Sequence, residues 1–580
     1  MTDFGISRFR RILFASCMGL ASTNLVDLTD TMIAGRLLGE KALSAINLFW
    51  PCVEFLFFVS TAIAAGSAIL YSRAVGEFNA RRASGIFSNG LVFSILAGIC
   101  LWGGLCLLCK PALAFYGISD EMSGYLSGYW YVYGIVAILF PLYVYLYTMV
   151  TSDGGSAIGV ASFLAELAVN AVASYFLCRV YGTAGCALGV LAGVLAAIAV
   201  ASLHFLRKTN SFVFCWHFSI RESVEAFLAD LPEASAALFT GFVYVVMNKM
   251  LIVWFGEDAI LAMTAVIVTN GFALFLYGVP RAAQPIVGVY WAEGNYGAVR
   301  RVMREALTTS IVLGAVVGAG FSFFPEVIVR LIGVTTPDIV RQSCFAVRVV
   351  ALTYPFVAVT ALFTAYYLYI ERATLSVLLV ALQSVVLPIL FSAVGAFSWG
   401  QNGFWLGYAL STPLAILLFF SLLKVAFRHE SLEAPPWFLD LTRDVYTTTW
   451  TLLTEPQEIC RVSEGVQAKL KALRAPARTQ AKASLLLEDM LMSIRARNNE
   501  KAVLAEVQLD IRSAVVKEGV FDARLLVRDD GVIVADEAES PRLEEENAAF
   551  RDEMLGKVLQ KLRSRRDRVT TGFNRREFVL

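Results

Sequence analysis

The stretch Leu38-Gly39-Glu40-Lys41-Ala42-Leu43 is answered 217 residues later by Phe255-Gly256-Glu257-Asp258-Ala259-Ile260. A long apolar run follows each copy. Each run ends in a polar turn and a basic cluster, Arg81-Arg82 in the first copy and Arg300-Arg301 in the second. Similarity at a fixed offset indicates an internal duplication. A duplicated apolar chain predicts a transporter whose two halves move against each other around a central site.

The composition divides the chain into two parts. Apolar residues make up 57% of the 580 residues, which is too many for a soluble protein of this length. The excess lies in residues 11–428, and the chain becomes charged and ordinary from about residue 435. The net charge of +1 gives no indication of nucleic-acid binding. The ten cysteines lie mostly in apolar runs, so we interpret them as packing residues rather than metal ligands.

The apolar windows predict an all-α polytopic membrane protein with twelve transmembrane helices. The predicted spans are 11–33, 43–72, 84–109, 125–150, 156–180, 184–207, 231–254, 259–291, 304–333, 345–370, 374–398 and 402–428. Six spans per copy keep both copies in one orientation, which predicts two parallel six-helix repeats. The repeats occupy residues 1–217 and 218–430. We expect the first span, 11–33, to be an uncleaved transmembrane helix rather than a signal peptide.

Loop charge predicts the orientation of these spans. With the N-terminus inside, fifteen Lys and Arg residues fall in cytoplasmic loops and only six fall outside. An excess of positive charge marks the cytoplasmic side. We therefore expect both termini to be cytoplasmic, in the inner membrane of a prokaryotic cell.

Polar side chains in the first half suggest an ion-coupling site. Asn24, Asp27 and Asp30 follow one another at three-residue spacing, so they share one face of the first helix. Glu166, Asn170 and Ser174 do so in the fifth span. If the two faces meet, they form one pocket that takes up a proton, or that holds Na⁺ at Asp30 and Asn170. The alternative is a set of hydrogen bonds that only packs the bundle.

The second half has a different set of polar residues. Asn248 and Lys249 stand near the position equivalent to Asp30, and Arg281 and Gln284 lie in the eighth span. We predict that they line the substrate cavity, together with Asn24 and Ser174. An ionisable group in a span is a functional candidate by default. Snorkelling to the interface is the alternative for Arg281.

The first copy resembles the multidrug and toxic compound extrusion (MATE) family. Its signature is the stretch from Thr29 to Gly35, followed by Leu38-Gly39 and Ala42-Leu43. The two parallel six-span repeats resemble that family too. The resemblance implies a secondary antiporter that exchanges Na⁺ or H⁺ for organic cations, with the acid at Asp30 as the coupling site and Asn170 beside it. Asp27 and Lys249 depart from the family pattern, and so does Ser174, which replaces an acid.

The C-terminal part is predicted to be a small cytoplasmic α/β domain, an α+β sandwich, at 476–580, after a linker and docking helix at 431–475. We expect a helix at 478–497, strands at 503–513, 522–528 and 575–580, and a helix at 547–566. The domain resembles the histidine-kinase-like ATPases of anti-sigma-factor kinases. The resemblance implies a nucleotide site at Glu488, Asp529 and Gly531. Met492 replaces the magnesium-binding asparagine, which favours a degenerate regulator over an active enzyme.

Three functions follow from these patterns. The first is an antiporter that exports organic cations or amphipathic compounds, needs no cofactor besides its coupling ion, and has a regulatory tail. The second is a flippase for a lipid-linked substrate, held by Lys249 and Arg281. The third is a membrane sensor that signals to a cytoplasmic protein. All three place the chain in a lipid bilayer with a small-molecule ligand, and none involves nucleic acid.

Overall fold

The computed structural model describes residues 3–579 except 24, 77–79, 154, 208–209, 211, 216–217, 371, 427–444, 474, 513–522, 532–563 and 570–572. The chain forms two compact units. We call Ser16–Pro280 with Leu307–Leu422 the helical unit, and Met1–Ala15, Arg281–Ala306 and Leu423–Leu580 the tail unit.

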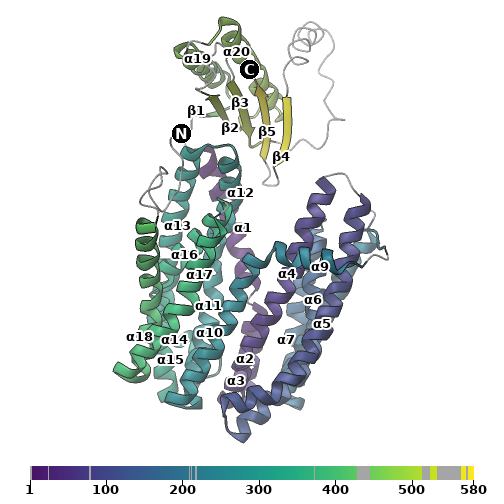
Figure 1. Ribbon diagram of the computed structural model, residues 1–580, viewed down its shortest axis with the longest axis vertical. Helices are drawn as coiled ribbons and strands as arrows, with labels where there is room; N and C mark the ends of the chain where they lie inside the picture. Colours follow the sequence, from purple (N-terminus) through teal and green to yellow (C-terminus); the bar gives the residue numbers. More distant parts are fainter. Residues whose placement is uncertain are drawn as a thin grey trace. The chain divides into compact units, whose positions relative to one another are not determined.

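The helices of the first copy follow the predicted spans closely. They are α1 (Phe4–Thr23), α2 (Leu25–Leu38), α3 (Glu40–Asn47), α4 (Trp50–Gly76), α5 (Ala80–Tyr116), α6 (Asp120–Ser152), α7 (Ser156–Tyr181) and α8 (Thr183–Ser202), which continues into the 3₁₀ helix η1 (Leu203–Leu206). The first predicted span is divided between α1 and α2. The short helix α9 (Ile220–Ala229) leads to the second copy. In Figure 1, α4 to α7 lie on one side of the helical unit, and α10, α11 and α15 to α18 lie on the other.

The second copy is broken into shorter pieces. They are α10 (Leu231–Phe255), η2 (Glu257–Ala259), α11 (Ile260–Ala273), η3 (Leu274–Tyr277), α12 (Gly278–Ala292), α13 (Tyr296–Phe323), α14 (Pro325–Leu331), α15 (Pro337–Ala351), α16 (Tyr354–Tyr369), α17 (Ala373–Ala381), the π-helical η4 (Leu382–Val386) and α18 (Leu387–Ala426). Prolines at the first or second residue of α14, α15 and α16 explain three of the starts.

Nine helices in the described residues are long and apolar enough to cross a membrane, or ten if α15 and α16, bent by 47°, form one span. Within α18, Trp399 and Gly400 are not helical, so α17, η4 and the first part of α18 correspond to the predicted span 374–398, and the rest of α18 corresponds to 402–428 as far as Ala426. Several predicted boundaries differ from the helix ends, two of them in neighbouring spans. The span 304–333 ends earlier, at Phe323, and 345–370 begins earlier, at Pro337.

The duplication is visible in the backbone. Gly39 has φ 86° and ψ −179°, and Gly256 has φ 87° and ψ 175°. Only glycine adopts this conformation without strain, and each of the two starts a short helix. Asn47 donates a hydrogen bond of 2.5 Å to Thr264, which lies 217 residues further on. Residues that the repeat maps onto one another therefore touch, which places this contact on the pseudo-twofold axis between the copies.

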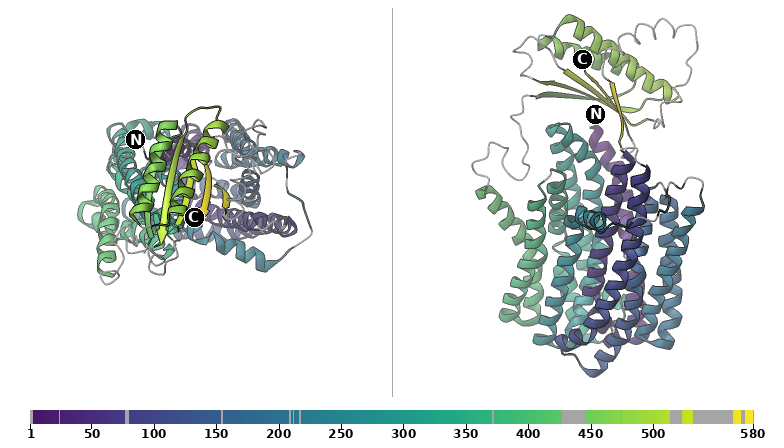
Figure 2. Two further views of the ribbon diagram at one scale, coloured as in Figure 1. Left: turned by 90° about the horizontal axis from the view of Figure 1, so that it is seen from above. Right: turned by 45° about the vertical axis from the view of Figure 1, so that its right-hand side comes forward.

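The tail unit contains a five-stranded antiparallel sheet in the order β1-β2-β3-β5-β4. The strands are β1 (Val445–Leu453), β2 (Leu504–Arg512), β3 (Ala523–Asp529), β4 (Ser564–Val569) and β5 (Phe573–Val579). The helices α19 (Pro456–Ala472) and α20 (Ala477–Arg497) pack on one face of it (Figure 2). The core between them includes Val466, Leu487, Val507 and Leu525.

This domain confirms the predicted α/β class and corrects two boundaries. β1 pairs with β2 along its whole length, and α19 contributes to the core. Residues 445–475 are therefore part of the folded domain, not the linker and docking helix that we predicted for 431–475. Residues 564–566, predicted as the end of a helix, lie in β4. The rest of that predicted helix lies outside the described residues.

Candidate functional site

The first copy brings together the predicted residues of α2 and α7. Asp30 Oδ2 accepts a hydrogen bond of 3.0 Å from the side-chain amide of Asn170, and Asp30 Oδ1 lies 3.0 Å from Ser174 Oγ. Ser174 Oγ is also 2.8 Å from Asn170 Oδ1. The three side chains thus form a closed ring, which we call the Asp30 ring. Ser174 is fully buried and Asn170 is 1% exposed.

The helix α7 presents one polar stripe to the interior of the bundle. Ser162, Glu166, Asn170 and Ser174 are all buried and follow at four-residue spacing. The Glu166 carboxylate accepts a hydrogen bond of 2.5 Å from the Tyr143 hydroxyl of α6. Glu166 therefore lies one turn from Asn170 with its own partner. The sequence analysis did not connect Tyr143 with Glu166, because no spacing rule links residues on different helices.

A stripe of glycines on α8 forms the back wall of the Asp30 ring. Gly185, Gly189 and Gly193 follow at four-residue spacing on the side of α8 that contacts α7. A Cβ at Gly189 would lie 2.0 Å from Ser174 Oγ, and one at Gly193 would lie 2.9 Å from the Asn170 side chain. The two backbones can approach only because these residues have no side chain. The sequence analysis missed this stripe, although its G-x-x-x-G-x-x-x-G pattern was available.

Two further predicted residues of the first half are less informative. Asp27 lies one turn before Asp30 on α2, is partly exposed, and is not a member of the ring. Asn24 lies outside the described residues. The structure therefore brings together Asp30, Asn170 and Ser174, and puts Glu166 next to them.

Lys249, predicted to line the substrate cavity, contacts the first copy. Its ammonium donates hydrogen bonds of 2.5 and 3.2 Å to the backbone oxygens of Phe115 and Tyr116, at the C-terminus of α5. A cation at the end of a helix satisfies free carbonyl groups and the helix dipole. The neighbouring Asn248 is fully buried, and its side-chain atoms have no hydrogen-bond partner in the described part of the chain.

The remaining predicted cavity residues lie in α12. Arg281 and Gln284 are both exposed. The ammonium of Lys249, one of the two cations on which the flippase hypothesis depends, is engaged by the C-terminus of α5. The tyrosines of the tenth predicted span, Tyr354, Tyr366 and Tyr367, are buried and therefore pack inside the protein.

Contacts between the two copies gather at the end of the helical unit that contains Gly39 and Gly256. Glu40 accepts hydrogen bonds of 2.6 and 2.8 Å from the amides of Thr335 and Thr336. Glu257 accepts bonds of 2.5 and 2.9 Å from Ser119. Together with the Lys249 contact, we call them the Gly39-end contacts. A cavity of about 620 Å³ beside them is lined by charged residues including Arg36, Lys41, Glu121 and Arg330.

The predicted nucleotide-binding residues of the tail lie on different elements and have different hydrogen-bond partners. Glu488 is partly buried on α20 and faces Ser484 at 3.5 Å. Asp529 is buried at the end of β3 and accepts a hydrogen bond of 3.1 Å from the amide of Gly531. Asp530, between them in sequence, pairs with Arg8 at 2.6 Å and with Arg11 at 2.7 Å. Met492 is 47% exposed.

Comparisons with known proteins find similarity in the helical part of the chain. Residues 15–176, which include the whole Asp30 ring, match the MatE family model. A solved inward-facing structure of a multidrug resistance MATE family transporter of the MOP superfamily aligns with a TM-score of 0.63 and 16% identity, over 70% of this chain and 96% of that chain. The helical part has the MATE fold.

Two further proteins show similarity over the same extent. The probable multidrug resistance protein NorM of Rhizobium meliloti (strain 1021) is 22% identical over 442 residues, which is 69% of this chain and 90% of NorM. A MOP superfamily transporter of Pyrococcus furiosus, described as having a binding pocket of reverse polarity, aligns with a TM-score of 0.57 and 15% identity over 74% of this chain and all of its own. More than a quarter of this chain thus lies outside the MATE fold.

Proposed function

We propose that the chain is a secondary antiporter of the MATE family that exports organic cations or amphipathic compounds in exchange for protons. The proposed location is the inner membrane of a prokaryote, with both termini in the cytoplasm. The MATE fold and the similarity to NorM support a multidrug exporter. The Asp30 ring is the observation that carries the proposal of proton coupling.

The hydrogen-bond count of the ring favours a proton on Asp30. The Ser174 hydroxyl has one hydrogen, yet two acceptor oxygens, Asp30 Oδ1 and Asn170 Oδ1, lie within 3.0 Å of it. If Asp30 is protonated, it donates to Ser174, which donates to Asn170, whose amide donates back to Asp30. Every group is then satisfied. If Asp30 is ionised, the single hydroxyl hydrogen of Ser174 can serve only one of its two neighbours. Ser174 Oγ then faces either Asp30 Oδ1 or Asn170 Oδ1 without a hydrogen between the two oxygens, and the ring should open.

Sodium is the alternative coupling ion. Asp30, Asn170 and Ser174 supply the hard oxygens that Na⁺ prefers. In the closed ring, however, these oxygens are used by one another at 2.8 to 3.0 Å. Sodium binding would need at least two of the three side chains to turn, whereas proton binding needs none to move. The geometry therefore supports H⁺ over Na⁺.

The Gly39-end contacts support an alternating-access cycle. They join the two copies at the end that loop charge predicts to be outside, so the state described here would be closed to the outside. We propose that loss of the proton from Asp30 opens the ring, changes the position of α2 against α7, and is coupled to opening of these contacts. A ligand shifts such an equilibrium only by binding the two states with different affinity.

The tail is proposed to regulate transport rather than to hydrolyse a nucleotide. Asp530, inside the D-x-G segment that the resemblance assigns to adenine, is engaged by two arginines of the chain itself. The exposed Met492 cannot hold magnesium. The part of the tail that faces away from these arginines is proposed to bind a nucleotide or a cytoplasmic protein.

The test uses purified protein in liposomes, with ethidium as the fluorescent organic cation. Asp30→Asn keeps the size of the side chain but fixes it in a neutral state. We expect it to abolish ethidium uptake driven by a pH gradient, while Asp120→Asn, a change of an exposed carboxylate at the start of α6, leaves uptake unchanged.

The outcomes separate the alternatives. Uptake by Asp30→Asn at the wild-type rate would refute the site assignment. Uptake that follows a sodium gradient and ignores the pH gradient would replace the proton by sodium. A wild-type protein that moves no ethidium, yet binds a cytoplasmic protein when ethidium is present, would favour the membrane sensor.

A further inference from the structure

One face of the tail sheet is polar and buried, which is unusual for a sheet. In β2, Ala505, Val507 and Leu509 face the helices α19 and α20, whereas Glu506, Gln508 and Asp510 alternate with them and face the other way. Glu506 and Gln508 are fully buried all the same. Arg528 of the neighbouring strand β3 joins them and is also fully buried. We call these four residues the polar sheet face.

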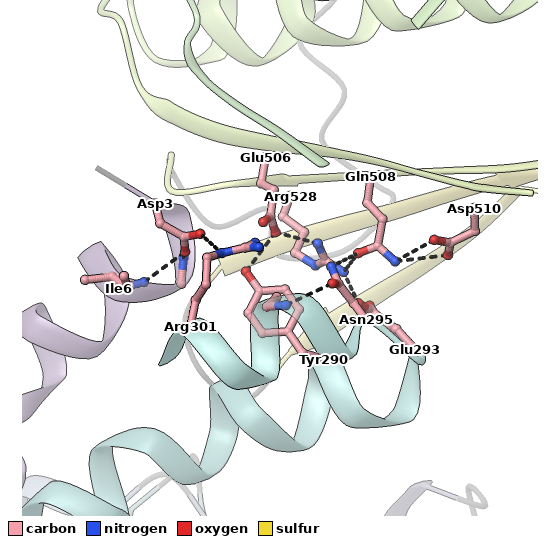
Figure 3. A network of polar contacts seen from close by, with 12 residues as sticks. Asp3, Ile6, Tyr290, Glu293, Asn295, Arg301, Glu506, Gln508, Asp510 and Arg528 are labelled. Atoms are coloured by element: carbon pink, nitrogen blue, oxygen red, sulfur yellow. Dashed lines mark hydrogen bonds and ion pairs between the residues drawn. The ribbon is translucent and has the colours of Figure 1, made fainter. Parts of the chain in front are cut away.

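The polar sheet face is covered by the turn between α12 and α13 (Figure 3). Arg528 pairs with Glu293 and, at 2.6 Å, with Glu506, and its guanidinium lies over the ring of Tyr290. The Tyr290 hydroxyl donates a bond of 2.8 Å to Glu506. Asn295 donates a bond of 2.9 Å to Gln508. The turn therefore meets the sheet through charged and hydrogen-bonding groups.

The sheet also holds the N-terminal segment. Asp530, directly after β3, pairs with Arg8 and Arg11 of α1. The same segment is fixed to α13, since Asp3 pairs with Arg301 and Arg10 pairs with Glu305, each at 2.6 Å. A Cβ at Gly5 would lie 2.9 Å from the Tyr290 ring, so α1 and α12 are in close contact. The tail, α1 and the α12–α13 turn thus form one polar cluster.

The chemistry of this cluster suits a contact that opens and closes. A domain that exposes an apolar face on release would aggregate, whereas a polar face is stable in water. The other face of the sheet is apolar and permanently covered by α19 and α20. Buried ion pairs contribute little net stability, because removing the charges from water costs about as much as their attraction returns. The ion pairs and hydrogen bonds therefore fix the position of the domain, but they contribute little enough net stability that it can dissociate.

The segments that the tail holds belong to different copies of the repeat. The helix α1 belongs to the first copy and leads into α2, which carries Asp30. The α12–α13 turn belongs to the second copy, and α13 runs on to Phe323. In a transporter whose two copies move against each other, a domain that is bound to segments of both copies opposes that motion.

We propose that the C-terminal domain is a brake that docks its polar sheet face on α1 and on the α12–α13 turn, and slows the transport cycle while it is docked. The brake rests on the proposed function, because it needs a transport cycle to act on. Release removes the contacts of the tail domain to α1 and to the α12–α13 turn, so that only the direct pairs between α1 and α13 still oppose opening of the ring at Asp30.

The experiment compares full-length wild type with Asp530→Ala in liposomes. It measures ethidium transport together with amide hydrogen exchange of residues 1–15 and 281–306. We expect transport to rise by about threefold or more and exchange in both segments to rise about tenfold, since the docked state no longer gains the contacts to Arg8 and Arg11. Asp489→Ala, on α20 of the same domain, is the matched control and should change neither quantity.

A second variant acts from the other side of the contact. Glu293→Gln lies outside the tail domain, so it weakens the pairing with Arg528 without altering the domain itself. It should raise transport and exchange in the same direction as Asp530→Ala. Faster exchange with unchanged or slower transport in both variants would refute the brake, and unchanged exchange would refute the docking. No ethidium transport in any protein, wild type included, would instead refute the proposed function.

Discussion

The two buried polar clusters of this chain are built from different chemistry. The Asp30 ring contains one carboxyl group, one amide and one hydroxyl, and it becomes neutral when a single proton binds. The Arg528 cluster contains a guanidinium that stays charged at every physiological pH, shared by the two carboxylates of Glu293 and Glu506. A neutral ring is tolerable inside a membrane, where a permanent charge is costly. The permanent charge of Arg528 lies at the docking surface, where water can hydrate it and its partners once the two surfaces separate.

This difference indicates how each cluster is switched. Loss of one proton can convert the Asp30 ring from satisfied to unsatisfied without any domain moving. In the Arg528 cluster the guanidinium stays charged whether or not Glu506 binds a proton, so this cluster changes mainly by separation of the two surfaces. Four substitutions or conditions would break or sharpen this distinction.

The largest effect is expected from Arg528→Met. The substitution leaves Glu506 and Glu293 buried without their cation, which costs about 3–5 kcal/mol in measured cases of buried pairs. The tail should undock, and the amide exchange of residues 281–306 should approach that of an open segment. Arg524→Met on the same strand is the control. If adding Glu506→Gln to Arg528→Met restores no protection, the charge explanation is wrong.

Gly189→Ala should have the next largest effect, and only on the Asp30 ring. The added Cβ would lie 2.0 Å from Ser174 Oγ, so α7 and α8 must separate, at a cost of about 1–3 kcal/mol. Thermal unfolding in detergent and ethidium transport should both decline. Gly103→Ala in α5, where a Cβ meets nothing within 4 Å, is the control and should be neutral or stabilising. If Gly189→Ala and Gly103→Ala lowered thermal stability and transport equally, the close contact between α7 and α8 would not explain the effect.

The third effect is a pH dependence of docking. Burial raises the pKa of Glu506 from 4.5 to about 8. An acid with a higher pKa in the docked state takes up a proton on docking, so docking is strongest at low pH and weakens as the pH rises toward 8. The slope approaches a factor of ten per pH unit. The charged or titratable groups around Glu506 are Asp3, Tyr290, Glu293, Arg301 and Arg528.

Exchange protection of residues 281–306, corrected for the intrinsic pH dependence of exchange, measures this effect between pH 6 and pH 9. The variant Glu506→Gln should be protected equally at both ends of the range. A wild-type protein with no change in protection over that range would show that Glu506 stays ionised in contact with Arg528.

The smallest effect is expected from Lys249→Met. The hydrogen bonds to Phe115 and Tyr116 lie at a helix end with partial access to solvent, so their loss should cost about 1 kcal/mol. The Gly39 end should open more readily, and labelling of a cysteine introduced at Ser119 should become a few times faster. Lys110→Met, near the end of the same helix α5, is the control. A loss of ethidium binding instead would return Lys249 to the substrate site.

The sequence predicted the parts of the fold that depend on local pattern. Apolar runs located the helices, and the alternation of Ala505 to Asp510 located β2. The spacing of Asp30 and of Asn170 with Ser174 placed each on one face of its helix, and the MATE resemblance brought the two helices together. The boundaries that failed, at Phe323 and Pro337, lie where short helices follow without a polar loop between them.

The rest depends on contacts between distant residues. Lys249 looks like a buried cation in sequence, and only the position of α5 shows that it binds backbone oxygens. The same holds for Tyr143 and Glu166. The burial of Glu506 and Gln508 was unpredictable for a stronger reason. A polar strand face normally indicates solvent, and nothing in the chain near β2 reveals that a turn more than 200 residues away covers it.

The hydrogen bond between Asn47 and Thr264 has a geometric consequence of its own. A point on a twofold axis can move only along that axis in any motion that treats the two copies alike. The contacts of Glu40, Glu257 and Lys249 have no such restriction. The Asn47–Thr264 contact can therefore remain intact in any such motion, which makes it a fixed reference for measuring displacements of the two copies.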